Sequence, residues 1–125
     1  MKAGLRASIR LKRIYEPRSI GDGYRILTTR FWPRGVSKDA KDEYSPKTAP
    51  SRDLLRRFKH EGLTWEDYVV TYLSEMASDE AKSAIKRLAE LAQCQTITLM
   101  CVCEDEEHCH RSLLRDLIAR AAEEQ

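Results

Sequence analysis

Apolar side chains near the start of the chain follow patterns typical of β-strands. Residues 5–15 alternate basic and apolar side chains, which predicts a strand with one face exposed to solvent. Residues 24–31 are rich in β-branched and aromatic side chains, and the turn-forming residues Trp32-Pro33-Arg34-Gly35 follow, so a second strand is predicted there. Residues 36–49 are polar and are predicted to form a surface loop.

Three helices are predicted in the middle of the chain, each preceded by a hydroxyl side chain that can cap it. The caps are Ser51, Thr64 and Ser78, and Gly62 is predicted to end the first helix in a left-handed conformation. In the second and third helices apolar residues recur every three or four positions, which indicates helices packed on a core. These positions are Trp65, Tyr68, Val69, Tyr72, Leu73 and Met76, followed by Ala81, Ala84, Ile85, Leu88 and Ala92.

The last part of the chain predicts a buried strand followed by a helix. Residues 96–103 contain no charged side chain, which is typical of a strand covered on both faces in a parallel sheet. Strands that alternate with helices indicate an α/β layered domain, with a small, mostly parallel sheet and helices packed on it. We expect one domain over residues 1–125, because this length buries a single core. The final helix is predicted to end near Glu124, with its apolar side at Leu113, Leu114, Leu117, Ile118 and Ala121.

The charged residues nearly balance. The 22 Lys and Arg against 20 Asp and Glu give a net charge of +2, which argues against nucleic-acid binding driven by bulk charge. Basic residues interrupt positions 1–13, so no signal peptide is predicted, and no other stretch has membrane-spanning length. We therefore expect a cytoplasmic protein without a membrane partner, in which the four cysteines are free thiols.

The segment from Cys103 to Ser112 holds a cluster of reactive groups, with two thiols, two imidazoles and a guanidinium. Cys109 and His110 lie four residues before Leu113 and Leu114, so they continue the core-facing side of the final helix towards its start. Cys103 ends the preceding strand, and ligands of open α/β sheets collect beyond the carboxyl ends of the strands. We predict catalytic roles for Cys103, Cys109 and His110, and ligand-binding roles for Arg111 and Ser112.

Two arginines flank the aromatic turn after the second predicted strand. If this strand runs parallel to residues 96–103, Arg30, Trp32 and Arg34 lie at the same edge of the sheet as the cysteines. Two guanidinium groups beside a helix start would bind a phosphate, a sulfate or a carboxylate. In the alternative interpretation Trp32 fills the core, and the arginines pair with Asp22 or with the acidic residues 104–107.

Several sharper functions do not fit the spacing. A cysteine phosphatase needs its nucleophile at a fixed distance before an arginine, and Asp105 stands at that position before Arg111. The chain has no glycine-rich phosphate loop. Zinc sites prefer Cys-x-x-Cys pairs, whereas this chain offers Cys101-x-Cys103 and Cys109-His110, so no metal ligand and no cofactor are assigned. Cys94 and Cys101 are interpreted as buried apolar residues, although Cys101 shares a strand face with Cys103.

Residues 9–15, 22–27, 30–35, 49–51 and 109–112 form motifs that keep their order over nearly the whole chain. Together they resemble the YeaO-like family, domain-of-unknown-function family 488. The resemblance implies a small cytoplasmic α/β protein, found mainly in bacteria and archaea, and it assigns no reaction. Some members have Asn-His-Ala in place of Cys109-His110-Arg111, which implies that Cys109 and Arg111 are not essential to a function shared by all members. Thr29 replaces the aspartate of the family's usual motif, so a carboxylate role is not implied at that position.

Three functions remain as hypotheses. The leading one is a small-ligand protein, with enzymatic activity left open, that binds an anionic group between Arg30, Arg34, Arg111 and the final helix start. His110 would then be the acid or base, with Cys103 or Cys109 as its thiol partner. The second is a thiol-redox or transition-metal-binding protein that uses the same three residues. The third is a noncatalytic module that binds a protein, or an RNA through basic residues on the exposed face of the first strand, and its candidate RNA contacts are Arg6, Arg10, Lys12 and Arg13. The oligomeric state is open, with residues 65–76 as a candidate dimer contact.

Overall fold

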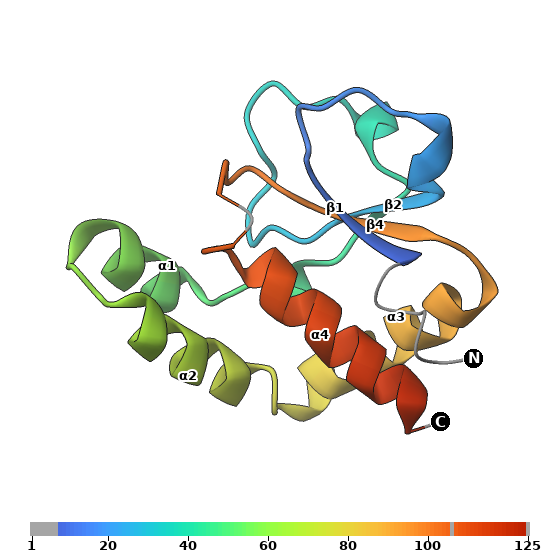
Figure 1. Cartoon of the computed structure of the whole chain (residues 1–125). Coiled ribbons are helices and arrows are strands. Elements are labelled where there is room, and N and C mark those ends of the chain that lie inside the picture. Colours follow the sequence, from blue (N-terminus) through green and yellow to red (C-terminus); the bar gives the residue numbers. More distant parts are fainter. Residues whose placement is uncertain (1–7, 106, 125) are drawn as a thin grey trace.

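The computed structural model describes residues 8–105 and 107–124, so residues 5–7 of the first predicted strand lie outside the described part. Four strands form an all-parallel sheet in the order β1-β4-β2-β3 (Figure 1). All five residues of the central strand β4 are buried, as its lack of charge predicts. The predicted α/β fold with a small parallel sheet is therefore confirmed. The strands are β1 (Ile9–Arg13), β2 (Tyr24–Leu27), β3 (Glu43–Tyr44) and β4 (Ile97–Cys101).

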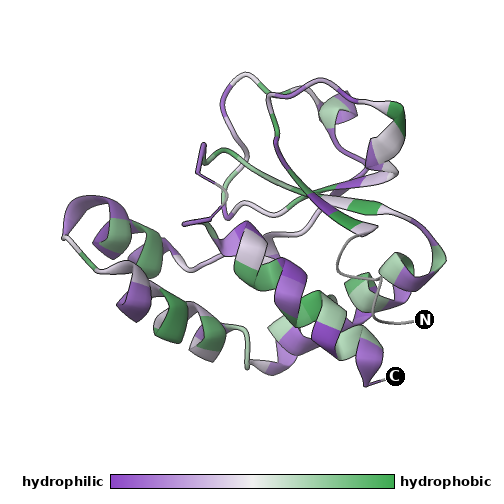
Figure 2. Ribbon diagram, in the orientation of Figure 1, coloured by the Kyte–Doolittle hydropathy of each residue, from purple (hydrophilic) through white to green (hydrophobic). Residues whose placement is uncertain are grey.

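Four helices pack against one another and against the sheet, and they are α1 (Arg52–His60), α2 (Trp65–Glu75), α3 (Asp79–Cys94) and α4 (His110–Glu123). The hydroxyls of Ser51, Thr64 and Ser78 accept a backbone N–H in the first turns of α1, α2 and α3, which confirms the predicted caps. Gly62 has a φ of +70°, as predicted for the residue after a helix end. Apolar and polar residues alternate along the helices (Figure 2), in keeping with one buried side on each. None of the described helices is long and apolar enough to cross a bilayer.

One position of the predicted apolar stripe of α2 differs. Leu73 is 41% exposed, whereas its neighbours Tyr72 and Met76 are buried. A helix that packs on one side only buries a narrow stripe, and Tyr72 and Met76 occupy it here. The prediction of Leu73 as a core residue is therefore wrong.

Loops with a short 3-10 helix (Lys38–Ala40), rather than α-helices, cover the other face of the sheet in the described part of the chain. Ile14, Leu27 and Met100 form a small second core there, packed against side chains of residues 36–44. Residues 36–49, predicted as a surface loop, contain strand β3 and buried Ser45 and Thr48. These two buried residues have hydrogen-bond partners in the protein. The Ser45 N–H donates to Leu27 O at 2.7 Å, and the Thr48 hydroxyl donates to Ser45 O at 2.9 Å. A polar sequence can therefore be buried where its backbone is paired.

The basic face of β1 is covered at Lys12, which corrects in part the expectation that this face is exposed to solvent, whereas Arg10 on the same face is exposed as expected. Lys12 is 8% exposed, and its ammonium donates to Asp22 at 2.9 Å. The guanidinium of Arg25 on β2 donates to the same carboxylate at 2.6 Å, and both Arg25 and Asp22 are buried. One buried carboxylate thus pairs with two buried cations. The RNA hypothesis loses Lys12 as a contact, and Arg6 lies outside the described residues.

Replacing Gly23 with alanine should lower the free energy of unfolding by about 2 to 3 kcal/mol. Gly23 has a φ of +61°, and an added Cβ would lie 2.2 Å from the carbonyl oxygen of Thr96. That oxygen accepts the Tyr24 N–H where β2 meets β4. Gly35→Ala is the control, because Gly35 has a φ of +76° with open space around its Cβ position, and it should lose only about 1 kcal/mol. Equal losses in urea unfolding of the two variants would contradict the close contact.

Candidate functional site

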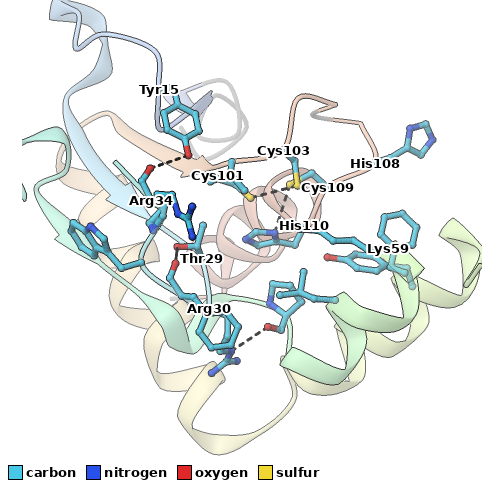
Figure 3. Close-up of a pocket in the computed structure, with 18 residues that line it drawn as sticks. Tyr15, Thr29, Arg30, Arg34, Lys59, Cys101, Cys103, His108, Cys109 and His110 are labelled. Atoms are coloured by element: carbon cyan, nitrogen blue, oxygen red, sulfur yellow. Dashed lines mark hydrogen bonds between the residues drawn. The ribbon is translucent and has the colours of Figure 1, made fainter. Parts of the chain in front are cut away.

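A pocket of about 400 Å³ lies beyond the carboxyl end of β4 (Figure 3). The end of β4 and the start of α4 supply one part of its wall, residues 29–34 supply another, and side chains of α1 and α2 complete it. The arrangement confirms that the strand end, the aromatic turn and the helix start open onto one hollow. It brings together Arg30, Trp32, Arg34, Cys103, Cys109 and His110 from the set predicted by the sequence.

Three sulfur atoms lie together in this pocket. The Sγ atoms of Cys101 and Cys103 are 3.7 Å apart, and those of Cys101, Cys103 and Cys109 all lie within 4.8 Å of one another. Strand alternation places Cys101 and Cys103 on the same side of the sheet, and Cys109 is the residue that caps α4. Cys101 was interpreted as a buried apolar residue, and it is buried but belongs to the cluster. Cys94 is exposed at the end of α3, so its predicted burial is wrong.

His110 is fixed by bonds to the end of β2. Its Nε2 lies 2.8 Å from Thr28 O and 3.0 Å from Thr28 Oγ1, which itself donates to Met100 O. A carbonyl oxygen can only accept, so Nε2 carries a hydrogen and Nδ1 is the nitrogen that faces Cys109, 3.6 Å from its Sγ. The second strand ends at Leu27 and not at Phe31 as predicted, and the carbonyl of the next residue, Thr28, pairs with His110 instead of a strand.

The three thiols differ in acidity. Hydrogen bonds from Cys101 and Cys103 lower the pKa of Cys109 well below its usual range, and His110 adds to this effect against the cost of burial. Hydrogen bonds with Cys103 and Cys109, together with burial, raise the pKa of Cys101. Cys109 also lies at the start of α4, where the positive end of the helix dipole favours a thiolate.

Arg111 and Ser112 do not line the pocket, which corrects their assignment beside the ligand. The guanidinium of Arg111 is buried and donates to Lys12 O at 2.6 Å, to Cys103 O at 2.7 Å and to Cys109 Sγ at 3.4 Å. Ser112 donates its hydroxyl to Cys109 O at 3.0 Å within the first turn of α4. Both residues therefore hold the segment that carries the thiols, and Arg111 reaches the site only through the sulfur of Cys109.

The rest of the pocket wall is apolar and cationic. Arg30 donates to Pro50 O and Ala49 O, both at 3.2 Å, so backbone carbonyls rather than acidic side chains hold it in place. Arg34 is exposed, and so is Trp32 at 39%, which rules out the interpretation of Trp32 as a core residue. Among the described residues that line the pocket there is no Asp or Glu. Apart from the Cys109 sulfur, the wall therefore offers cationic groups and no carboxylate, which suits an anionic ligand.

Sequence reasoning missed the part of the wall that comes from α1 and α2. Phe58, Lys59 and Tyr68 line the pocket, and the ring centroids of Phe58 and Tyr68 lie 4.6 Å apart. Tyr68 was predicted as a core residue of α2, and it is buried as predicted. The periodic spacing of Tyr68 predicted its burial but not its position in the wall of the pocket. No signal in the sequence singled out Lys59.

Comparisons with known proteins find bacterial relatives of this chain. Protein YeaO of Escherichia coli strain K12, described as uncharacterised, is 37% identical over 111 residues, which cover 87% of this chain and 95% of the relative. The uncharacterised proteins Rv3073c of Mycobacterium tuberculosis and Mb3100c of Mycobacterium bovis are each 28% identical over 82 residues, which cover 64% of this chain and 70% of the relative. No solved structure matches the chain. A family model described as the active DUF488-N3 subclade matches residues 9–122, and the chain therefore belongs to the DUF488 family.

Proposed function

We propose that this protein binds a small molecule with a flat apolar body and one anionic group, and that the pocket beyond β4 is its binding site. The observation that carries the proposal is the pocket wall, where aromatic rings alternate with cationic side chains. A volume of about 400 Å³ suits a small metabolite rather than a macromolecule. The match to a subclade described as active supports an enzyme rather than a passive binder.

The wall of the pocket offers two kinds of contact to such a ligand. Arg34 and Lys59 are exposed side chains of the wall and can pair with an anionic group, while Phe31 and Phe58 offer ring faces to its apolar body. Arg30 uses Nε and one N–H of Nη2 for the carbonyls of Pro50 and Ala49, so the two N–H groups of Nη1 and the second one of Nη2 are the donors that it can offer. Charge pairing and ring contact together would fix the orientation of the ligand.

The reacting end of the ligand would lie against the sulfur cluster and His110. The bonds from Nε2 to Thr28 leave Nδ1 of His110 on the side of Cys109, where it can exchange a proton with a bound molecule or with the thiol. Because Cys101 and Cys109 are buried, this part of the pocket is drier than the part lined by the exposed Arg34. We therefore assign the predicted catalytic roles to His110, Cys103 and Cys109 as part of this proposal.

Calorimetric titration with phenyl phosphate, a nucleoside monophosphate and inorganic phosphate tests the proposal. We expect the two aromatic phosphates to bind more tightly than inorganic phosphate, because only they can contact the rings. Arg34→Ala should weaken this binding by about tenfold, the loss of one exposed charge-assisted contact. Lys38→Ala removes an exposed cation outside the pocket and should leave the affinity for the aromatic phosphates unchanged. No binding by the parent protein, or equal affinities in both variants, would contradict the proposal.

A further inference from the structure

We propose that Cys101, Cys103, Cys109 and His110 bind one thiophilic metal ion, and that Zn²⁺ is the ion that this donor set favours. The proposal goes beyond the binding of an anionic ligand and does not depend on it. With the ion bound, Nδ1 of His110 and the thiolates are ligands, so the proton exchange proposed above belongs to the metal-free protein. It rests on the positions of four donor atoms, on the group that orients His110 and on the charge of the side chains around them.

The spacing of the donor atoms fits tetrahedral coordination. A zinc ion with bonds of about 2.3 Å to sulfur and about 2.0 Å to nitrogen holds two sulfurs about 3.8 Å apart, and a sulfur and a nitrogen about 3.5 Å apart. Cys101 Sγ and Cys103 Sγ are 3.7 Å apart, and Cys109 Sγ and His110 Nδ1 are 3.6 Å apart. All three sulfurs lie within 4.8 Å of one another, and the contact between His110 Nδ1 and Cys109 Sγ places the fourth donor beside this group.

The orientation of His110 is the one that a metal ligand requires. Histidine ligands usually donate their second ring N–H to a backbone carbonyl or a carboxylate, which fixes the ring and leaves the other nitrogen for the metal. Here Nε2 donates to Thr28 O at 2.8 Å, and Nδ1 points towards the sulfurs (Figure 3). The support for His110 comes from the end of β2, whereas the three thiols come from β4 and the segment before α4. Separate elements thus hold the donors in place.

The charge of the surroundings also suits a divalent ion. Three thiolates and one Zn²⁺ carry a net charge of −1, and the buried guanidinium of Arg111 lies 3.4 Å from Cys109 Sγ and brings the total to zero. A neutral total is what a buried site needs. The ligands contain no carboxylate, and soft sulfur donors select Zn²⁺ or Cu⁺ over Mg²⁺ and Ca²⁺. Cys103 is only half-buried, so the ion can enter from the pocket.

Zinc uptake by the reduced, metal-free protein tests the site without any variant. We expect one Zn²⁺ per chain in a competition titration with a chromophoric chelator. Rapid alkylation followed by mass spectrometry should then show three cysteines protected by Zn²⁺, while Cys94, which is exposed and lies outside the cluster, reacts freely. An alkylation pattern of Cys101, Cys103 and Cys109 that is the same with and without Zn²⁺ would overturn the proposal. Conversion of the cluster to a disulfide without zinc uptake would overturn it as well and favour the thiol-redox hypothesis.

Two variants and two controls locate the ion. Cys101→Ser and Cys109→Ser should each lower the zinc affinity by at least about 100-fold, because each removes a direct ligand. Cys94→Ser should keep the parent affinity, and so should Arg34→Ala, which separates the metal site from the anion pocket. Retention of full affinity in both ligand variants would place the metal elsewhere and overturn the assignment. If either ligand variant fails to fold, the alkylation pattern of the parent protein still decides.

Discussion

Asp22→Asn should lower the free energy of unfolding by about 3 to 5 kcal/mol. The carboxylate is fully buried and accepts hydrogen bonds from Lys12 at 2.9 Å, from Arg25 at 2.6 Å and from the Ser19 N–H at 3.0 Å. Asparagine has the same shape but no charge, so the substitution leaves two buried cations without a counter-charge. Its amide group also places N–H donors where only acceptors are needed.

Urea unfolding of the parent and the variant measures this loss. The urea concentration at the midpoint should fall while the slope of the transition stays the same, since the surface exposed on unfolding is unchanged. Asp53→Asn is the matched control, because Asp53 pairs with Arg56 at the surface and both side chains are more than half exposed. It should lose less than about 1 kcal/mol. A similar small loss in Asp22→Asn would show that the buried cations find other partners.

The ion pairs of Asp22 with Lys12 and Arg25 should also make the stability of the fold depend on pH in the acidic range. Burial alone would raise the pKa of Asp22, but hydrogen bonds from Lys12, Ser19 and Arg25 outweigh it and hold the pKa well below its usual range. A pKa that is lower in the folded state contributes stability above the unfolded value of about 4, and this contribution is lost as the pH falls below it. We therefore expect the parent protein to lose stability from about pH 4 downwards, and Asp22→Asn to depend less on pH there. Parallel curves for the two proteins would refute this role of Asp22.

The elements that the sequence predicts well are those with a local signal. The lack of charge in residues 96–103 marks the central strand, and the hydroxyls of Ser51, Thr64 and Ser78 mark helix starts that the structure confirms. The spacing of Cys109 and His110 from the apolar side of the last helix also predicts their burial correctly. Each of these signals depends on neighbours within a few residues, so one sequence is enough to detect it.

The features that the sequence misses depend on contacts between distant segments. Lys12 looks like a solvent-facing residue of an alternating strand until the loop that carries Asp22 covers it. Cys101 looks like any small core residue until Cys103 and Cys109 lie beside it. Residues 36–49 look like a loop because their burial depends on pairing with β2. In each case a polar or reactive group is placed by a partner that local patterns do not identify.

Arg111 is a further group placed by distant partners. Its position at the helix start predicted an anion-binding role, whereas in the structure it holds neighbouring segments together. Its guanidinium links three segments, because it donates to the carbonyl of Lys12 in β1, to the carbonyl of Cys103 after β4 and to the sulfur of Cys109. A planar fork can make these bonds at once, whereas a lysine ammonium of the same charge is a point donor. The position therefore needs the shape of arginine as well as its charge.

Arg111→Met should accordingly lower the free energy of unfolding by about 3 to 5 kcal/mol, because it leaves one buried and one partly buried carbonyl without this donor. Arg111→Lys should lose less, since its ammonium still reaches one carbonyl at a time. Arg120→Met, an exposed position in the last turn of the same helix, should lose less than about 1 kcal/mol and is the control. Urea unfolding ranks the three variants, and the rate of alkylation of Cys103 reports whether the segment after β4 loosens. A lysine variant as stable as the parent would mean that charge alone holds this segment against the thiols, and that the fork geometry contributes nothing.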